Sequence, residues 1–186
     1  MYSAKISKKR VISVALIILS IVIVYKNVDI NHRFPNAAII EKHMNEDVEI
    51  SHDLIAKVKE FHIDDIQAYE KTVTENIRQL GGEAKVAIAQ IEIDNYSTES
   101  RDWMAFECIL QNNVWSNGIN LDLFYELNPE TFDIECRLDG QSRQNINLPF
   151  VIYDFQMKEK QWKKLNASQF ELVLSFYPER ISIKLH

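Results

Sequence analysis

The sequence predicts a mainly β protein: an N-terminal transmembrane helix followed by an immunoglobulin-like antiparallel β-sandwich with one short helix near the C-terminus. A run without charged residues, Val11–Tyr25, lies close to the N-terminus. About eight short runs of alternating apolar and polar residues follow, bounded by residues typical of turns. Only one later stretch, Asp154–Asn166, has apolar residues at helical spacing. Many short strands with a single short helix are typical of a sandwich.

The apolar run is predicted to be an uncleaved signal-anchor helix. It is shorter than the roughly 20 residues that span a bilayer, but Lys26 can reach the interface and extend the usable helix to Val28. The predicted helix, 11–28, is then about 27 Å long. No small-x-small cleavage site follows it, and no nearby cysteine indicates a lipoprotein signal. A cleaved signal peptide and a buried core helix are the alternatives.

Charge is distributed unevenly along the chain, whose net charge is −6. Residues 1–31 contain five basic residues and one acidic residue, which leaves 16 of the 21 basic and 26 of the 27 acidic residues to the remainder. Because most nearby basic residues precede the helix, we expect a cytoplasmic N-terminus and an extracellular C-terminal domain. Such an acidic domain would repel nucleic acid and anionic lipid head groups, so we expect no nucleic-acid partner.

The predicted organisation has four parts: a cytoplasmic tail at 1–10, the membrane helix at 11–28, a linker at 29–47 and the exported domain at 48–186. The linker is inferred from Phe34-Pro35-Asn36 and the polar residues after it, which are typical of extended chain. A chain of 186 residues accommodates one domain with such attachments.

Two strands are predicted in the first half of the domain. Leu54, Ala56 and Val58 share one face, and Phe61 continues the pattern after a one-residue slip that suggests a bulge. A second slip separates two apolar pairs within Val86–Ile93. The polar residues between these strands, 64–83, are expected to form a long loop that ends in two glycines.

The second half of the domain contains the remaining strands. Alternation is found at Met104–Leu110, Ile119–Tyr125, Phe132–Leu138, Ile146–Leu148, Phe170–Phe176 and Ile181–Leu185. Asp139-Gly140 predicts a turn, and Pro149 predicts an edge strand or the end of pairing. The stretch Asp154–Asn166 predicts a short amphipathic helix with Asp154 as its cap.

Three segments carry a resemblance to a known family: Asn31–Asn36, Trp115–Phe124 and Leu148–Phe150. With the basic tail and the helix before them, they resemble small membrane-anchored surface proteins of Gram-positive bacteria that form an uncharacterised domain family. More distantly, the strand pattern is similar to immunoglobulin-like accessory domains of secreted Gram-positive lipoproteins. The resemblance implies topology, fold class and a bacterial cell surface, and it supplies no catalytic residue.

The sharpest enzyme hypothesis is a sortase-like thiol transpeptidase. Such enzymes also combine an N-terminal anchor with a β-rich exported domain, and here Cys136 is followed by Arg143 and preceded far upstream by His62. The two threonines of the sortase strand, which resembles Thr-Leu-x-Thr-Cys, are missing. Cys136 also shares the apolar face of its run with Ile134 and Leu138, where burial silences a thiol. Core packing is therefore the preferred interpretation of this cysteine.

Other catalytic and cofactor motifs are missing from the sequence. The five histidines are scattered, without the spacing of a zinc site. The acidic residues Glu46, Asp47, Glu49 and Asp53 lack the spacing of a calcium loop. No phosphate loop, dinucleotide fingerprint or nucleophile elbow is present. We therefore expect no metal, no cofactor and no enzyme activity.

The two cysteines, Cys108 and Cys136, both lie on the apolar side of their predicted strands. Facing strands would allow them to form a disulfide in an exported domain. Cysteine is also commonly buried as a small apolar residue. We expect two free, buried thiols, with a disulfide as the alternative.

A polar and aromatic segment, Asn112–Ile119, is the best candidate for a recognition loop. Trp115, Asn117 and Asn120 are its tentative binding residues, because tryptophan among amides on a loop is typical of recognition surfaces. The alternative is that Trp115 closes the end of the sandwich.

The sequence thus predicts a non-catalytic, membrane-anchored binding module whose partner is an envelope protein or an exported peptide. The alternatives are an accessory subunit of a membrane transport or secretion complex and the sortase-like transpeptidase.

Overall fold

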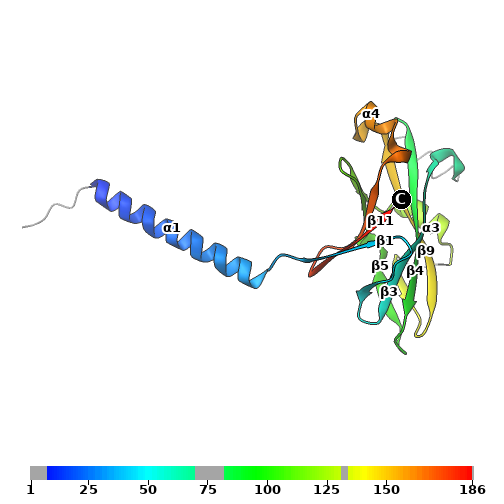
Figure 1. Ribbon diagram of the computed structural model, residues 1–186, viewed down its shortest axis with the longest axis horizontal. Helices are drawn as coiled ribbons and strands as arrows, with labels where there is room; N and C mark the ends of the chain where they lie inside the picture. Colours follow the sequence, from blue (N-terminus) through cyan, green and yellow to red (C-terminus); the bar gives the residue numbers. More distant parts are fainter. Residues whose placement is uncertain (1–7, 70–81, 131–133, 186) are drawn as a thin grey trace, which may run out of the picture. The chain divides into compact units, whose positions relative to one another are not determined.

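The computed structural model describes residues 8–69, 82–130 and 134–185 (Figure 1). The chain divides into an N-terminal unit, which ends at Ala37, and a β-rich unit that begins at Ala38. Most of the polar loop predicted at 64–83 lies outside the described residues.

The N-terminal unit contains helix α1, Lys8–Arg33, of 26 residues. It is longer than the predicted 11–28, because helical structure continues through the polar residues after Tyr25, where Arg33 forms an ion pair with Asp29 at 3.1 Å. Within it, Ala15–Arg33 is long and apolar enough to cross a membrane, judged by length and composition.

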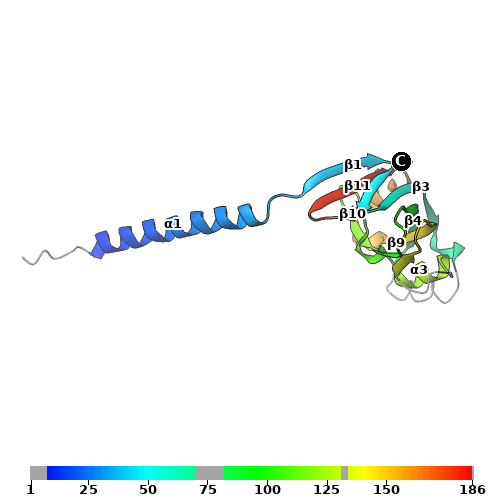
Figure 2. The ribbon, with the colours of Figure 1, turned by 90° about the horizontal axis from the view of Figure 1, so that it is seen from below.

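The β-rich unit is a sandwich, as predicted. One sheet has the strand order β1 (Ala38–His43), β11 (Glu179–Leu185), β10 (Phe170–Ser175), β6 (Ile109–Gln111) and β7 (Ser116–Gly118). The other has the order β2 (Val48–Ser51), β3 (Leu54–Asp65), β4 (Ala84–Asn95) and β9 (Arg143–Tyr153). A separate antiparallel pair joins β5 (Arg101–Met104) to β8 (Glu135–Leu138). Pairing is antiparallel except between β1 and β11, which run parallel (Figure 2).

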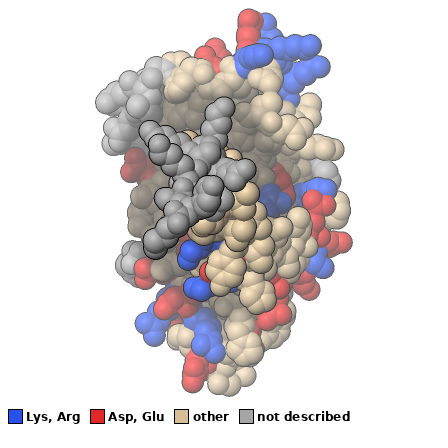
Figure 3. Space-filling model, turned by 90° about the vertical axis from the view of Figure 1, so that its left-hand side faces the viewer, with Lys and Arg blue, Asp and Glu red and all other residues tan. Residues whose placement is uncertain are grey.

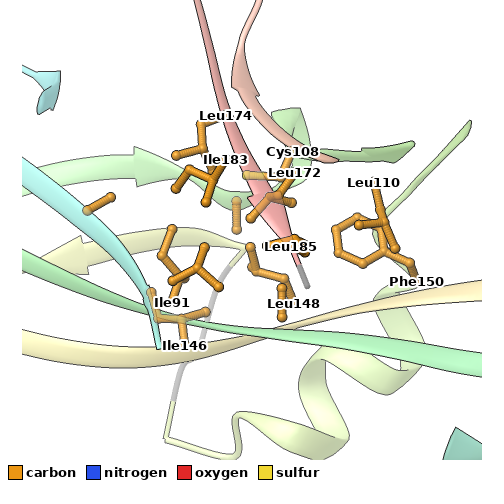
Figure 4. Close-up of a cluster of buried hydrophobic side chains, with 14 of the residues drawn as sticks. Ile91, Cys108, Leu110, Ile146, Leu148, Phe150, Leu172, Leu174, Ile183 and Leu185 are labelled. Atoms are coloured by element: carbon orange, nitrogen blue, oxygen red, sulfur yellow. The ribbon is translucent and has the colours of Figure 1, made fainter. Parts of the chain in front are cut away.

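The core lies between the two large sheets. Leu172, Leu174 and Ile183 point from one sheet toward Ile91 and Leu148 of the other (Figure 4). All five side chains are buried. Burial of several such side chains, each contributing about 1.5–3 kcal/mol, explains why the alternating runs of the sequence become strands.

Strand β1 corrects the predicted linker, 29–47, and the predicted start of the domain at residue 48. Residues 38–43 of that range pair with β11 in a register that joins Ala38 to Glu179 and His43 to Lys184. The strand is mostly exposed because it lies at the edge of its sheet. Its apolar residues, Ala38-Ile39-Ile40, are consecutive and only Glu41-Lys42-His43 are polar, so no alternation marks the segment as a strand.

The bulge predicted in the first strand is confirmed, and the slip predicted in the second is not. In β3 the register shifts between Val58 and Glu60. Strand β4 pairs with β9 without any shift. Its apparent slip arises because both faces of β4 are buried: Ile91 packs in the main core, whereas Ile88 belongs to a second apolar cluster on the outer face.

Helix α3, Leu121–Leu127, stands where the alternation at Ile119–Tyr125 predicts a strand. Asn120 caps it, since its side chain accepts a hydrogen bond from the Leu123 amide at 3.0 Å. Leu123 and Phe124 are buried, while Leu121 is half exposed. The apolar residues of this short segment fit the spacing of a strand as well as that of a helix. The cap at Asn120 favours the helix.

The run Met104–Leu110 is also not one strand. A 3₁₀ turn, Ala105–Glu107, separates β5 from β6, and it leaves Phe106 exposed rather than on the face of Cys108. The edge position predicted from Pro149 is confirmed, since β9 is the last strand of its sheet. That strand nevertheless continues to Tyr153.

The stretch predicted as one short helix contains three short pieces: 3₁₀ turns at Asp154–Gln156 and Leu165–Ala167, and helix α4 at Glu159–Trp162. The predicted cap, Asp154, is wrong. Lys158 takes that position before α4, where its amide donates to Gln161 Oε1 at 3.0 Å.

Candidate functional site

The candidate residue Trp115 lies at the end of the sandwich and is 6% exposed. Its ring packs edge-on against Phe170, with centroids 6.3 Å apart. Its indole Nε1 donates to Gln156 Oε1 at 2.8 Å. The structure therefore places this side chain in the core, which is the packing alternative considered for it.

The two candidate asparagines stabilise neighbouring backbone. Asn117 Nδ2 donates to the Val151 carbonyl at 3.1 Å and links β7 to β9. Asn120 caps α3. The three candidates lie close together in the sequence, but each side chain makes contacts within the fold.

A groove opens beside the same loop. It has a volume of about 480 Å³, and we call it the α4 groove. It is lined by Asn112, Asn113, Val114, Met157, Lys160, Gln161, Lys164, Leu165, Ser168 and Gln169. The groove thus brings the first half of the predicted recognition loop against the segment around α4.

Local hydrogen bonds fix the loop side of the groove. Asn112 Oδ1 accepts from the amides of Val114 and Trp115, both at 2.9 Å. The Asn112 amide donates to the Trp115 carbonyl at 2.8 Å. This tight turn buries Trp115 and leaves Val114 50% exposed beside the groove. A packed tryptophan therefore positions the loop residues that are available to a ligand.

The other side of the groove is basic within an acidic domain. Lys158, Lys160, Lys163 and Lys164 follow one another within seven residues, and Figure 3 shows Lys and Arg side chains gathered at the α4 end of the domain, at the top of that view. Lys163 pairs with Glu159. Within the described part of the chain, Lys160 and Lys164 have no acidic partner at salt-bridge distance, and both are exposed. These two ammonium groups are available to an anionic ligand group.

A second, smaller hollow of about 170 Å³ shares Asn112, Asn113 and Gln169 with the α4 groove. The two hollows adjoin at these three residues, and we describe them together as one track, whose smaller part is also lined by Glu171 and Lys184. Its amide side chains can both donate and accept hydrogen bonds, and Val114, Met157 and Leu165 supply apolar contacts. Such a track suits an extended peptide, whose backbone presents donors and acceptors in alternation.

The sortase-like residues do not assemble. Cys136 is fully buried in β8. Arg143 lies at an exposed cross-strand ion pair with Asp94, which its Nη2 reaches at 2.9 Å. His62 pairs with Asp64 at 3.4 Å near solvent. A substrate cannot approach a thiol that has no exposed surface.

Neither cysteine forms a disulfide, and both are buried. Burial raises the pKa of the Cys108 thiol far above its ordinary value, and the neighbouring Cys136 and Glu107 add to the shift. A thiol in this state is a poor nucleophile at neutral pH.

The acidic residues considered for calcium act separately. Asp47 pairs with Lys57 at 2.6 Å, and Glu46 accepts from the His43 amide at 3.0 Å. Asp53 lies 3.9 Å from Arg101. Among residues 8–69, 82–130 and 134–185, no three His, Cys, Asp or Glu side chains converge as metal ligands would.

Sequence reasoning missed the α4 side of the groove. The lysine-rich stretch is visible in the sequence, but its spacing predicts only a short amphipathic helix. That Lys160 and Lys164 face a loop more than forty residues earlier in the sequence follows from the pairing of β6 with β10, which no local pattern predicts.

Comparison with known proteins connects this architecture to a family. The model of a family described as Domain of unknown function (DUF5028) matches residues 36–181. The chain belongs to the DUF5028 family. The match confirms the predicted resemblance to an uncharacterised family, and it begins two residues before β1. No curated protein matches this DUF5028 chain.

Solved structures similar to this DUF5028 protein come from Gram-positive bacteria. An uncharacterised β-sandwich protein of Clostridium difficile is 11% identical, with 81% of this chain and 97% of that one covered and a TM-score of 0.47. A functionally unknown protein of Listeria monocytogenes is 14% identical, with 77% and 81% covered and a TM-score of 0.48. The Bacillus subtilis protein ycdA, described as an inferred lipoprotein, is 13% identical over 75% of this chain, with a TM-score of 0.46. This chain spans 38% of the length of ycdA.

Proposed function

We propose that this protein is a membrane-anchored, non-catalytic binding module that holds an extended segment of an envelope protein or an exported peptide in the α4 groove. Helix α1 anchors it in a single pass, with the N-terminus in the cytoplasm and the sandwich outside the cell. The observation that carries the proposal is the groove itself, where two exposed lysines without acidic partners among the described residues stand beside amide and apolar side chains.

Charge complementarity indicates the chemistry of the ligand. The domain is acidic overall, so it repels most acidic surfaces. Lys160 and Lys164 make a local exception: Lys160 lies in α4, Lys164 lies two residues after its end, and both line the groove. A ligand segment with an acidic side chain or a free carboxyl terminus would be attracted to this end of the domain and disfavoured elsewhere.

Photocrosslinking in intact cells tests the proposal. A benzophenone amino acid replaces Val114, which is 50% exposed at the groove, or Tyr96, which is 61% exposed on a distant turn. We expect a discrete peptide or protein adduct from position 114 and none from position 96. Equal adducts from both positions, or none from position 114, would contradict the proposal.

Charge reversal provides the matched control. Lys160→Glu with Lys164→Glu should reduce the yield of the adduct by about tenfold, as expected for the loss of one good ionic contact. Lys163→Glu changes the charge of the same segment at a residue that does not line the groove, and it should leave the yield unchanged. A chain without α1 should keep its affinity for the ligand. Loss of affinity in that chain would favour the accessory subunit of a membrane complex.

A further inference from the structure

The turn between β10 and β11 carries exposed aromatic side chains. Phe176 is 48% exposed and Tyr177 is 54% exposed. On the neighbouring strand β1, Ile39 is 72% exposed. The Ala38 amide donates to the Pro178 carbonyl at 3.3 Å, so the hairpin tip and the beginning of β1 lie side by side (Figure 2). These three large apolar side chains therefore belong to the same end of the domain.

The length of the connecting chain limits how far this end can be from a membrane. Helix α1 ends at Arg33 and β1 begins at Ala38. Four intervening residues span at most about 17 Å when fully extended. If the predicted span 11–28 crosses the bilayer, the five helical residues after Val28 add about 8 Å. The start of β1 and the hairpin tip beside it then lie within about 25 Å of the end of the span, whatever the orientation of the domain.

The side chains at the tip suit the membrane interface. Tyrosine prefers the level of the head groups, and phenylalanine and isoleucine contribute apolar area just below it. The hollow beside β1 is lined by three acidic side chains, Asp47, Glu49 and Glu179, and one lysine, Lys42, so its net charge does not favour anionic lipid. Contact with the bilayer therefore has to depend on apolar insertion rather than on electrostatic attraction.

We propose that the β10–β11 tip, Phe176 and Tyr177 with Ile39 beside them, inserts into the head-group region of the membrane that α1 crosses. Two aromatic side chains bind a bilayer weakly on their own, but the short tether makes the contact intramolecular and raises the effective concentration of the tip at the surface. The tip follows Ser175, the last residue of β10, whereas the α4 groove lies beside Phe170, the first residue. The two ends of this strand are about 17 Å apart. Insertion of the tip would thus direct the groove away from the lipid.

This inference rests on the proposed anchor, and one pair of variants tests it. The full chain carries Tyr177→Trp or Phe155→Trp and is incorporated into phosphatidylcholine vesicles with brominated acyl chains, which quench nearby tryptophan. Phe155 is the matched control, because it is 61% exposed but lies at the α4 end of the domain. Of the native tryptophans, Trp103 and Trp115 are buried in the core.

We expect the emission added by Tyr177→Trp to be largely lost in brominated vesicles, with or without 0.5 M salt, and the emission added by Phe155→Trp to persist. Equal quenching in both variants, or quenching of Tyr177→Trp that requires anionic lipid and low salt, would overturn the inference. So would emission of Tyr177→Trp that changes with protein concentration instead of lipid, because a second copy of the chain would then cover the tip. Vesicle flotation separates the two proposals: a chain that does not float contradicts the anchor, and one that floats without quenching contradicts the tip contact alone.

Discussion

At the residue scale, Asn95 connects three segments at the end of β4. Its Nδ2 donates to the carbonyls of Glu99, Leu138 and Asp139 at 2.8–3.2 Å, and its Oδ1 accepts from the Ser97 amide at 3.0 Å. The residue is 2% exposed. Because a buried polar group without its partners is costly, this side chain determines how the two turns pack.

The change Asn95→Asp keeps the shape of the side chain and removes the donor. A carboxylate would then face three carbonyl oxygens, so we expect the free energy of unfolding to fall by about 2–3 kcal/mol. Urea denaturation measures it. Ser100→Ala on the same turn, where the side chain is exposed, should cost less than about 0.5 kcal/mol. Equal losses from both changes would contradict the role given to Asn95.

The two cysteines give a second prediction at this scale. Since neither forms a disulfide and both are fully buried, a thiol reagent should label neither in the native protein, and both should be labelled after denaturation without reductant. Mass spectrometry counts the labels. No labelling until reductant is added would indicate a disulfide, and rapid labelling of native Cys136 would revive the transpeptidase hypothesis.

Sequence patterns predict whether an individual residue is buried better than they predict which residues it contacts. The apolar alternation around Cys136 and Leu138 predicts their burial correctly. It fails for Phe106, because a turn interrupts the strand there. The hydrogen bond from Trp115 to Gln156 joins residues 41 positions apart. Only the folded topology brings these two side chains together.

At the element scale, helix α3 depends on its cap and on one buried face. Asn120→Ala removes the acceptor of the Leu123 amide, and we expect it to cost about 1 kcal/mol of stability. Leu123→Ala empties part of the outer cluster against β4 and β9 and should cost about 2–5 kcal/mol. Leu121→Ala, on the exposed face, is the control and should be nearly neutral. Equal losses from Leu121→Ala and Leu123→Ala would instead fit the strand that the alternation predicts, in which both side chains lie on one face.

A polar cluster joins β6, β10 and β11. Gln111 Nε2 donates to Glu171 Oε2 at 2.6 Å, and Arg180 lies 3.2 Å from the same oxygen. Partial burial opposes ionisation of Glu171, but Ser182, Gln111 and Arg180 together outweigh it and hold the pKa of this carboxyl below its ordinary value.

A group whose pKa is lowered by folding stabilises the protein above its unfolded pKa, about 4.3 for glutamate, and this contribution is lost as the pH falls further. We therefore expect the melting temperature to decrease below about pH 4, and to decrease less steeply in Glu171→Gln. Parallel pH profiles of the two proteins would contradict this contribution. Glu159→Gln, at an exposed ion pair, is the control.

Strands with one buried face were predictable, and elements that depend on distant pairing were not. The bulge of β3 is visible as a slip in its alternation. The same kind of slip in β4 has a different cause, because α3 covers the outer face of that strand. Strand β1 has no apolar alternation and is defined by its pairing with β11, more than 130 residues away.

At the scale of the whole molecule, the boundary of the domain is a testable feature. A chain that begins at Ala38 contains every strand of the five-stranded sheet, whereas one that begins at Val48, the predicted start of the domain, exposes the edge of β11. We expect the longer chain to be monomeric and β-rich by circular dichroism, and the shorter chain to melt at a lower temperature and associate through the open edge. Equal melting temperatures of the two chains would indicate that residues 38–47 form a linker, as the sequence predicts.

The proposed function requires the sandwich to lie outside the cell. Labelling of intact cells with a membrane-impermeant thiol reagent tests this most directly, because both native cysteines are buried and contribute no background. Glu159→Cys places an exposed thiol on α4, and Ser3→Cys places one in the N-terminal tail. We predict that Glu159→Cys is labelled in intact cells and Ser3→Cys only after permeabilisation. The reverse result would put the α4 groove in the cytoplasm and contradict the proposed function.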